Sequence, residues 1–168
     1  MGALPDTGIL GYGRFGRALG ERLREAGAQV LALDPHSPPG PEVAADSVEA
    51  LAEASELLVL AVPLVHMEGV LAELVPFLLP RHLVMDVGSV KTRPAAMLER
   101  VLGSDIPWVA THPLFGPVSL ALGEPSRVVV CPNPTHPAAV ARGTMWKVSV
   151  NTGTNRDRKD EKKLRARF

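Results

Sequence analysis

Short apolar segments alternate with amphipathic ones along most of this chain. Six apolar runs have the length of buried strands: residues 7–10, 29–33, 57–62, 82–87, 108–111 and 127–131. Apolar residues at helical spacing follow the first run as far as Gly27, and the same spacing returns in residues 47–54, 65–79 and 94–102. Strands that alternate with helices in this way predict an α/β fold with a doubly wound, mainly parallel sheet.

The connections between these strands predict where functional residues gather. Right-handed crossovers in a parallel sheet place all the carboxyl ends of the strands along one edge. Gly11, Pro63, Gly88 and His112 each follow one of the predicted strands. We therefore expect these four positions to lie along the same edge of the sheet.

A glycine pattern lies between the first predicted strand and the first predicted helix. Gly11, Gly13 and Gly16 have the spacing of a dinucleotide-binding fingerprint and predict a Rossmann-like fold. The first glycine permits the turn, the second lets backbone approach a pyrophosphate, and the third lets helix pack on strand. The alternative is a glycine turn that only tightens the packing. The remaining predicted cofactor-binding residues come from this segment and from later strand ends: Arg14, Phe15, Val62, Pro63 and Ser89.

An acidic residue ends the second predicted strand, 18 residues after Gly16. The carboxylate of Asp34 can accept hydrogen bonds from ribose hydroxyls and would repel a 2′-phosphate, so the predicted cofactor is NAD rather than NADP. No arginine occurs in residues 35–41 to accommodate that phosphate. His36 could contact a phosphate, and a solvated loop histidine is the alternative interpretation.

Composition divides the chain into two parts. It has 168 residues, of which 46% are hydrophobic, and its formal charge is zero. Residues 151–168 nevertheless hold seven Lys and Arg against three Asp and Glu. We expect a dinucleotide-binding domain over residues 1–142 and an irregular or disordered basic tail over 143–168. The acids within the tail and its lack of interleaved aromatic residues argue against nucleic acid as a partner.

Several classes of protein are not expected from this sequence. No basic and apolar leader precedes the first predicted strand, which indicates the cytoplasm. No apolar run is long enough to cross a bilayer, so a membrane partner is not expected. The single Cys131 is interpreted as a small core residue rather than a nucleophile, and no spacing of cysteine and histidine predicts a metal site.

A histidine segment follows the fifth predicted strand. His112 opens a loop, residues 112–117, that two prolines stiffen and Gly116 relaxes. Imidazole has a pKa suited to proton transfer near neutrality, and catalytic groups concentrate on loops held by a rigid scaffold. A structural histidine at a strand end is the alternative.

Three segments taken together resemble the prephenate/arogenate dehydrogenases of tyrosine biosynthesis: residues 11–16, 86–91 and 112–117. The resemblance covers roughly residues 7–140. It implies NAD-dependent oxidative decarboxylation of prephenate or arogenate, a small cyclohexadienol. His112 matches the family histidine that hydrogen-bonds the ring hydroxyl. Ser89 matches a serine between nicotinamide, substrate and histidine, with capping of the following helix as its alternative. Lys91 is interpreted as an exposed first-turn residue.

The resemblance also sets expectations for the rest of the molecule. Members of this family continue into a helical domain that completes the substrate pocket and builds a homodimer. This sequence instead becomes charge-rich after Trp146. We therefore expect a truncated or frame-shifted form whose activity and dimerisation are in question. Two alternatives stay open: a non-catalytic dinucleotide-binding module, and a dehydrogenase of another small hydroxy or amino acid. His66, His82 and His136 are interpreted as structural or solvated.

Overall fold

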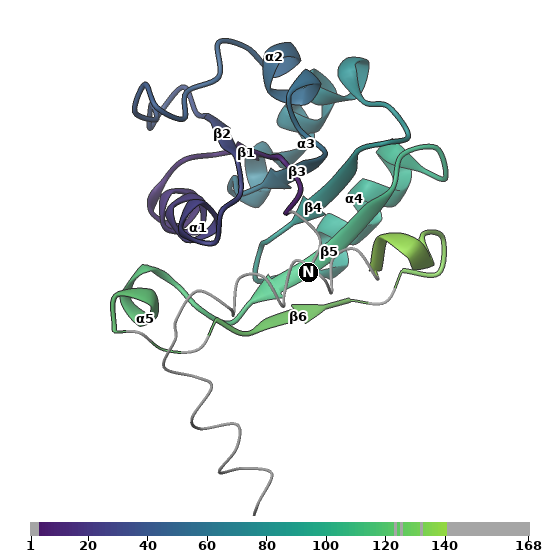
Figure 1. The fold of residues 1–168 in the computed structure, drawn as a ribbon. Coiled ribbons are helices and arrows are strands. Elements are labelled where there is room, and N and C mark those ends of the chain that lie inside the picture. Colours follow the sequence, from purple (N-terminus) through teal and green to yellow (C-terminus); the bar gives the residue numbers. More distant parts are fainter. Residues whose placement is uncertain (1–3, 123, 125, 132, 141–168) are drawn as a thin grey trace, which may run out of the picture.

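The computed structural model describes residues 4–122, 124, 126–131 and 133–140. Its strands are β1 (Thr7–Leu10), β2 (Val30–Leu33), β3 (Leu57–Leu60), β4 (Leu83–Asp86), β5 (Trp108–Pro113) and β6 (Val128–Val130). Its helices are α1 (Arg14–Glu25), α2 (Val48–Glu53), α3 (Leu64–Leu74), α4 (Thr92–Leu102) and α5 (Pro117–Ala121), with a 3-10 turn η1 (Val75–Phe77) after α3. Strands and helices alternate as the apolar pattern predicts (Figure 1).

The six strands form one sheet in the order β2-β1-β3-β4-β5-β6. The first five are parallel, and β6 pairs antiparallel with β5. The chain leaves β1 to build β2 on one side and then crosses back to build β3 on the other. In open α/β sheets ligands bind in the crevice at such a reversal, which here falls at the carboxyl ends of β1 and β3. The predicted Rossmann-like, doubly wound fold is confirmed.

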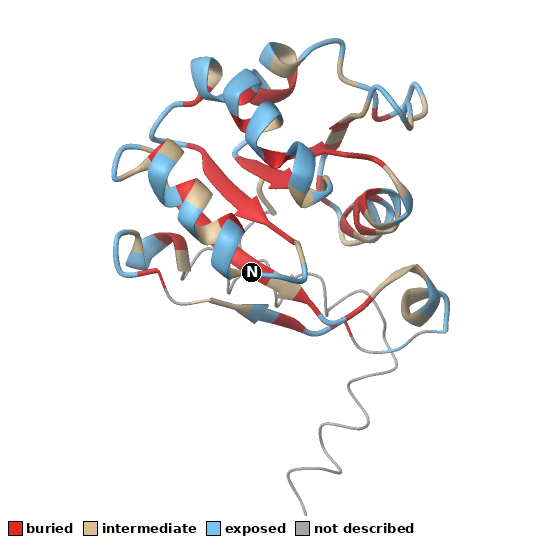
Figure 2. Cartoon of the chain, turned by 180° about the vertical axis from the view of Figure 1, so that it is seen from behind, coloured by how far each residue is buried: buried red, intermediate tan, exposed pale blue. Residues whose placement is uncertain are grey.

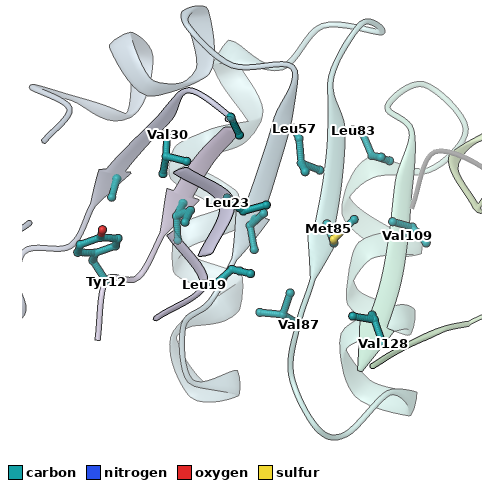
Figure 3. Close-up of a cluster of buried hydrophobic side chains, with 14 of the residues drawn as sticks. Tyr12, Leu19, Leu23, Val30, Leu57, Leu83, Met85, Val87, Val109 and Val128 are labelled. Carbon is teal, nitrogen blue, oxygen red and sulfur yellow. The ribbon is translucent and has the colours of Figure 1, made fainter. Parts of the chain in front are cut away.

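Apolar side chains cover both faces of the sheet, because successive residues of a strand point to opposite faces. On one face, Leu57, Met85 and Val109 pack in a cluster with Leu19 and Leu23 of α1 (Figure 3). The opposite face carries a second cluster, formed with α2, α3 and α4. The central strands β1, β3 and β4 are buried throughout, and the outer faces of the helices are exposed (Figure 2). The short helix α5 lies on the α1 side of the molecule (Figure 1).

The boundaries of some elements differ from the sequence predictions for physical reasons. The predicted helix over 65–79 divides into α3 and η1 at Pro76, which lacks the N–H needed to continue an α-helix. The strand predicted over 108–111 continues through His112 and Pro113, because Val129 and Val128 pair with them from β6. The segment predicted as a loop therefore begins inside a strand. The helix α5 was missed, because five residues are too few to show helical spacing.

The predicted tail over 143–168 lies outside the described residues. Within the part of the chain that the structure describes, no helix is both long and apolar enough to cross a bilayer.

Candidate functional site

The turn after β1 explains why glycine occupies two of its positions. Gly11 has φ +94°, a left-handed conformation that side chains rarely adopt, and a Cβ there would lie 2.7 Å from the Ala61 carbonyl oxygen. A Cβ at Gly16 would lie 2.1 Å from the carbonyl oxygen of Gly11. Gly11 thus permits the turn that connects β1 to α1, and Gly16 lets α1 approach this turn closely.

Gly13 differs from these two glycines. It has an ordinary extended conformation, and a Cβ there would meet no described atom within 4 Å. Gly13 is also the N-cap of α1, yet no side chain of the described residues caps this helix, and no acidic residue occupies its first turn. The first N–H groups of α1 therefore have no side-chain cap, and the position beside the positive end of the helix dipole at Gly13 is open. This arrangement fits a phosphate group.

Asp34 follows β2 beside this turn and orders the backbone around itself. Its Oδ2 accepts a hydrogen bond from the backbone N–H of Tyr12 (2.7 Å), and its Oδ1 accepts from His36 (2.8 Å) and Ser37 (2.9 Å). Partial burial opposes ionisation, but the hydrogen bonds from Ser37, Tyr12 and His36 outweigh it and lower the pKa of Asp34 below its usual value. A fixed carboxylate thus lies at the edge of the β1–β3 crevice.

Val62 and Pro63 form the other side of this crevice. Ala61 donates its N–H to the Leu10 carbonyl (2.8 Å) and so brings the end of β3 against the glycine turn. A Cβ at Gly11 would lie 2.9 Å from Val62 Cγ1, and Pro63 begins α3 as its N-cap. The predicted cofactor residues of the two strand ends are therefore adjacent in space.

Two histidines also meet near Asp34: His36, whose place in the sequence allows a phosphate contact, and His66, which carried no prediction of cofactor binding. The rings of His36 and His66 stack at 6.5 Å between centroids and 19° between planes, and both residues are exposed. His66 lies in the first turn of α3, and His36 lies in the loop after β2. Their contact joins the two segments that border the crevice.

His112 is half-buried within β5. Its Nδ1 is buried, and no described residue forms a hydrogen bond with it. The side chain of Phe115, three residues later, packs against Phe15 of the glycine segment with ring centroids 5.8 Å apart. The two motifs, about 100 residues apart in the sequence, are thus in direct contact on the α1 side of the sheet.

Ser89 is exposed in the segment between β4 and α4. The N-cap of α4 is Lys91, so the alternative interpretation of Ser89 as the cap of this helix is wrong. The interpretation of Lys91 as an exposed first-turn residue is wrong as well. Its ammonium group turns inward to the carboxylate of Asp86 and to the backbone carbonyl of Thr111. Sequence reasoning missed these contacts because Asp86 and Thr111 belong to two different strands.

The other candidates have structural positions. His82 is fully buried and accepts a hydrogen bond from the Leu79 N–H at Nδ1 (2.9 Å), and burial lowers its pKa. His136 contacts the Gly103 carbonyl through Nε2 (2.7 Å) and packs edge-on against Trp108. Cys131 is half-buried beside the second apolar cluster. Among the described residues, no three His, Cys, Asp or Glu side chains come together as metal ligands would.

A cleft of about 280 Å³ lies between α1 and α5, away from the predicted site. Its lining includes three acidic residues, Glu21, Glu25 and Glu124, against one basic residue, Arg22, and it contains none of the predicted cofactor or catalytic residues. Acidic side chains on both walls do not suit an anionic dinucleotide or a carboxylate substrate. The crevice at the ends of β1 and β3 is therefore the stronger candidate.

The parallel sheet, the three glycines and the acidic residue after β2 define a dinucleotide-binding dehydrogenase domain. Comparison with known families agrees. Residues 41–141 match the family model of the prephenate dehydrogenase nucleotide-binding domain. Residues 5–70, which hold the glycine turn, match the NAD-binding domain of D-isomer specific 2-hydroxyacid dehydrogenases. The chain thus carries a domain of the type that uses NAD or NADP, and it belongs to the prephenate dehydrogenase family.

Individual relatives are consistent with this membership. The chain is 34% identical over 126 residues to arogenate dehydrogenase 1, chloroplastic, of Arabidopsis thaliana, with 70% of this chain and 20% of the relative covered. It is 30% identical over 107 residues to a probable arogenate/prephenate dehydrogenase of Methanocaldococcus jannaschii, with 64% and 22% covered. The chain thus spans about a fifth of the length of these relatives.

A solved structure shows the same fold. Prephenate dehydrogenase from A. aeolicus, in complex with hydroxyphenyl propionate and NAD⁺, superposes with a TM-score of 0.67 at 21% identity. The match covers 88% of this chain and 56% of that one.

Proposed function

We propose that this chain is the cofactor-binding part of a dehydrogenase that uses NAD to oxidise and decarboxylate prephenate or arogenate. The observation that carries the proposal is the contact between Phe15 and Phe115. It joins the glycine segment, which suits a dinucleotide, to the segment that begins with His112, which suits proton transfer. Membership of the prephenate dehydrogenase family supplies the substrate class. Residues 1–142 are the proposed extent of the dinucleotide-binding domain.

In the proposed cofactor site the backbone receives the pyrophosphate. Gly13 leaves space for it, and the uncapped N–H groups of α1, at Arg14 and Phe15, provide hydrogen-bond donors. Asp34 accepts a ribose hydroxyl with its remaining acceptor capacity, because a carboxylate has about four acceptor positions and three described N–H groups occupy three of them. The same charge disfavours a 2′-phosphate, which supports NAD over NADP.

The proposed role of His112 is to accept a proton from the ring hydroxyl of the substrate. The bound cofactor supplies a hydride acceptor. As His112 takes the hydroxyl proton, carbonyl character develops at the ring carbon, and departure of its hydride becomes easier. Loss of carbon dioxide leaves the electron pair of the broken C–C bond in the ring, which becomes aromatic, and the proton returns to the oxygen. Ser89, exposed at the end of the neighbouring β4, is proposed to orient substrate and cofactor.

The test is turnover by the 168-residue chain with NAD and each cyclohexadienyl substrate, followed as NADH absorbance. His112→Asn is expected to lower kcat by roughly 10²- to 10⁴-fold, the usual effect of losing a general base. His136→Asn is the matched control, since His136 packs against Trp108 at the opposite end of β5. An unchanged rate in His112→Asn would assign His112 to structure instead.

A second candidate function has a specific observation in its favour. The match of residues 5–70 to D-isomer specific 2-hydroxyacid dehydrogenases is consistent with oxidation of a small hydroxy acid. Turnover of simple 2-hydroxy acids without turnover of prephenate or arogenate would establish that candidate. Tight binding of NADH without turnover of any of these compounds would instead establish a non-catalytic dinucleotide-binding module.

A further inference from the structure

The ammonium group of Lys91 joins two strands at the edge of the sheet that carries the proposed site. It contacts Asp86 Oδ2 at the end of β4 and the backbone carbonyl oxygen of Thr111 in β5. The second oxygen of Asp86 accepts the N–H of Gly88 (2.9 Å). One ion pair therefore reaches both segments that contain a proposed catalytic residue, since Gly88 precedes Ser89 and Thr111 precedes His112.

These contacts lie where the regular sheet ends. The last residue pair between β4 and β5 is Asp86 with Ala110, so β5 continues beyond its parallel neighbour from Thr111 onward. On the other side, β6 pairs with Thr111, His112 and Pro113. On the β4 side, Lys91 binds the Thr111 carbonyl, and Thr111 Oγ1 donates to the Asp86 carbonyl (2.8 Å). Beyond the last β4–β5 residue pair, the side chains of Lys91 and Thr111 thus make the hydrogen bonds that hold β5 on that side.

Burial makes this ion pair a strong structural constraint. Only 4% of the Asp86 side chain and 21% of the Lys91 side chain are exposed. Removing one partner of a buried pair leaves an uncompensated charge, which has a larger effect than breaking an exposed pair. Arg93, two residues further along in α4, is exposed and does not take part in this cluster.

We propose that Lys91 is a positioning residue for catalysis, which fixes His112 through the Thr111 carbonyl and Ser89 through Asp86. It acts through the backbone of its neighbours and does not touch the reacting atoms. The role in catalysis rests on the proposed function, but the placement of His112 by Lys91 can be measured without any turnover. A displacement of about 1 Å can reduce an enzymatic rate by about 100-fold, so a modest shift of His112 is measurable in kcat.

The test compares Lys91→Met, Lys91→Arg and the control Arg93→Met in the 168-residue chain. Nitrogen-15 NMR of the histidine rings, assigned with His112→Asn, reports the environment and tautomer of His112. We expect Lys91→Met to shift the His112 ring resonances and Lys91→Arg to restore them in part, because arginine can still donate to both oxygens. Arg93→Met should leave the resonances unchanged. Unchanged His112 resonances in folded Lys91→Met would overturn the proposal.

Kinetics separates positioning from general loss of structure. With the substrate that the chain turns over, Lys91→Met should lower kcat by roughly 10- to 100-fold, which is a larger loss than the accompanying weakening of NADH binding through Ser89. Equal loss of NADH binding and kcat would indicate a structural role only and would count against the proposal. Absence of both NADH binding and turnover in the unaltered chain would refute the proposed function, and the NMR comparison would still decide the role of Lys91.

A further variant covers the case in which Lys91→Met does not fold. Asp86→Asn combined with Lys91→Met removes both charges and leaves no unpaired buried ion. The proposal predicts the same shift of the His112 ring resonances in this double variant. A folded double variant with the resonances of the unaltered chain would overturn it.

Discussion

Gly13 and Gly16 offer a direct test of the proposed cofactor site, because Gly16 is needed for packing and Gly13 is not. A methyl group at Gly13 would meet no described atom within 4 Å. The conformation of Gly13, φ −67° and ψ −164°, is open to any residue. Alanine stiffens the unfolded chain but is a poorer N-cap than glycine. We therefore expect Gly13→Ala to change the free energy of unfolding by less than about 1 kcal/mol, because these effects oppose each other.

Gly16→Ala is the matched comparison. Its new methyl group would lie 2.1 Å from the Gly11 carbonyl oxygen, whereas real Cβ atoms essentially never approach such an atom within 3.0 Å. Helix α1 or the turn would have to move by about 0.9 Å. Overpacking of this kind costs about 1–3 kcal/mol, and the better helix propensity of alanine offsets about 1 kcal/mol of it. A net loss of up to about 2 kcal/mol is expected.

The assay combines urea denaturation with titration of NADH by fluorescence. Gly13→Ala should keep its unfolding midpoint and weaken NADH binding by at least about tenfold, which corresponds to about 1.4 kcal/mol. Gly16→Ala should lose both stability and binding. Unchanged NADH affinity in Gly13→Ala would refute the assignment of this open space to the pyrophosphate.

Two further predictions concern titratable groups. Asp34→Asn should weaken binding of NAD by about tenfold and leave NADP binding unchanged or improved, since the repelling charge is gone. Equal losses for both cofactors in a binding titration would contradict the ribose role. Asp46→Asn, at an exposed position, is the control. Burial lowers the pKa of His82 in the folded chain, so the unfolded chain binds a proton more readily. The free energy of unfolding should therefore fall as pH drops below about 6.5, with a slope of at most about 1.4 kcal/mol per pH unit. His82→Gln should flatten that dependence in urea titrations at pH 7.5 and 5.5, and an undiminished slope would assign the effect to other groups.

Local patterns predict the sheet because the central parallel strands are short apolar runs buried on both faces. Residues 7–10 and Leu57–Leu60 show this directly. The glycine spacing similarly predicts the turn, because Gly11 and Gly16 lie in close contact with neighbouring backbone, whereas Gly13 adjoins open space. The strands and the glycine turn are predictable because their contacts are with the adjacent strands and helix, which the fold class already specifies.

Other features depend on partners that the pattern does not specify. The strand β5 extends through His112 only because β6, the one antiparallel strand among those described, pairs with it. The inward position of Lys91 depends on Asp86 and Thr111, which the sheet brings together. The contact between Phe15 and Phe115 is also a product of the complete fold. The sequence thus predicts the candidate residues, but it does not predict the contacts that position them.

The strand order has a consequence for how the chain folds. Reading the order β2-β1-β3-β4-β5-β6 in the direction of synthesis, each strand from β3 onward joins an edge of the sheet already present, and none is inserted between two others. The unit β1-α1-β2 spans only residues 7–33, so its contacts are local and close early. Contacts between residues close in sequence also form faster than contacts between distant segments, because they close shorter loops. The glycine turn can therefore form well before β5 and β6, and the position of His112 is set last.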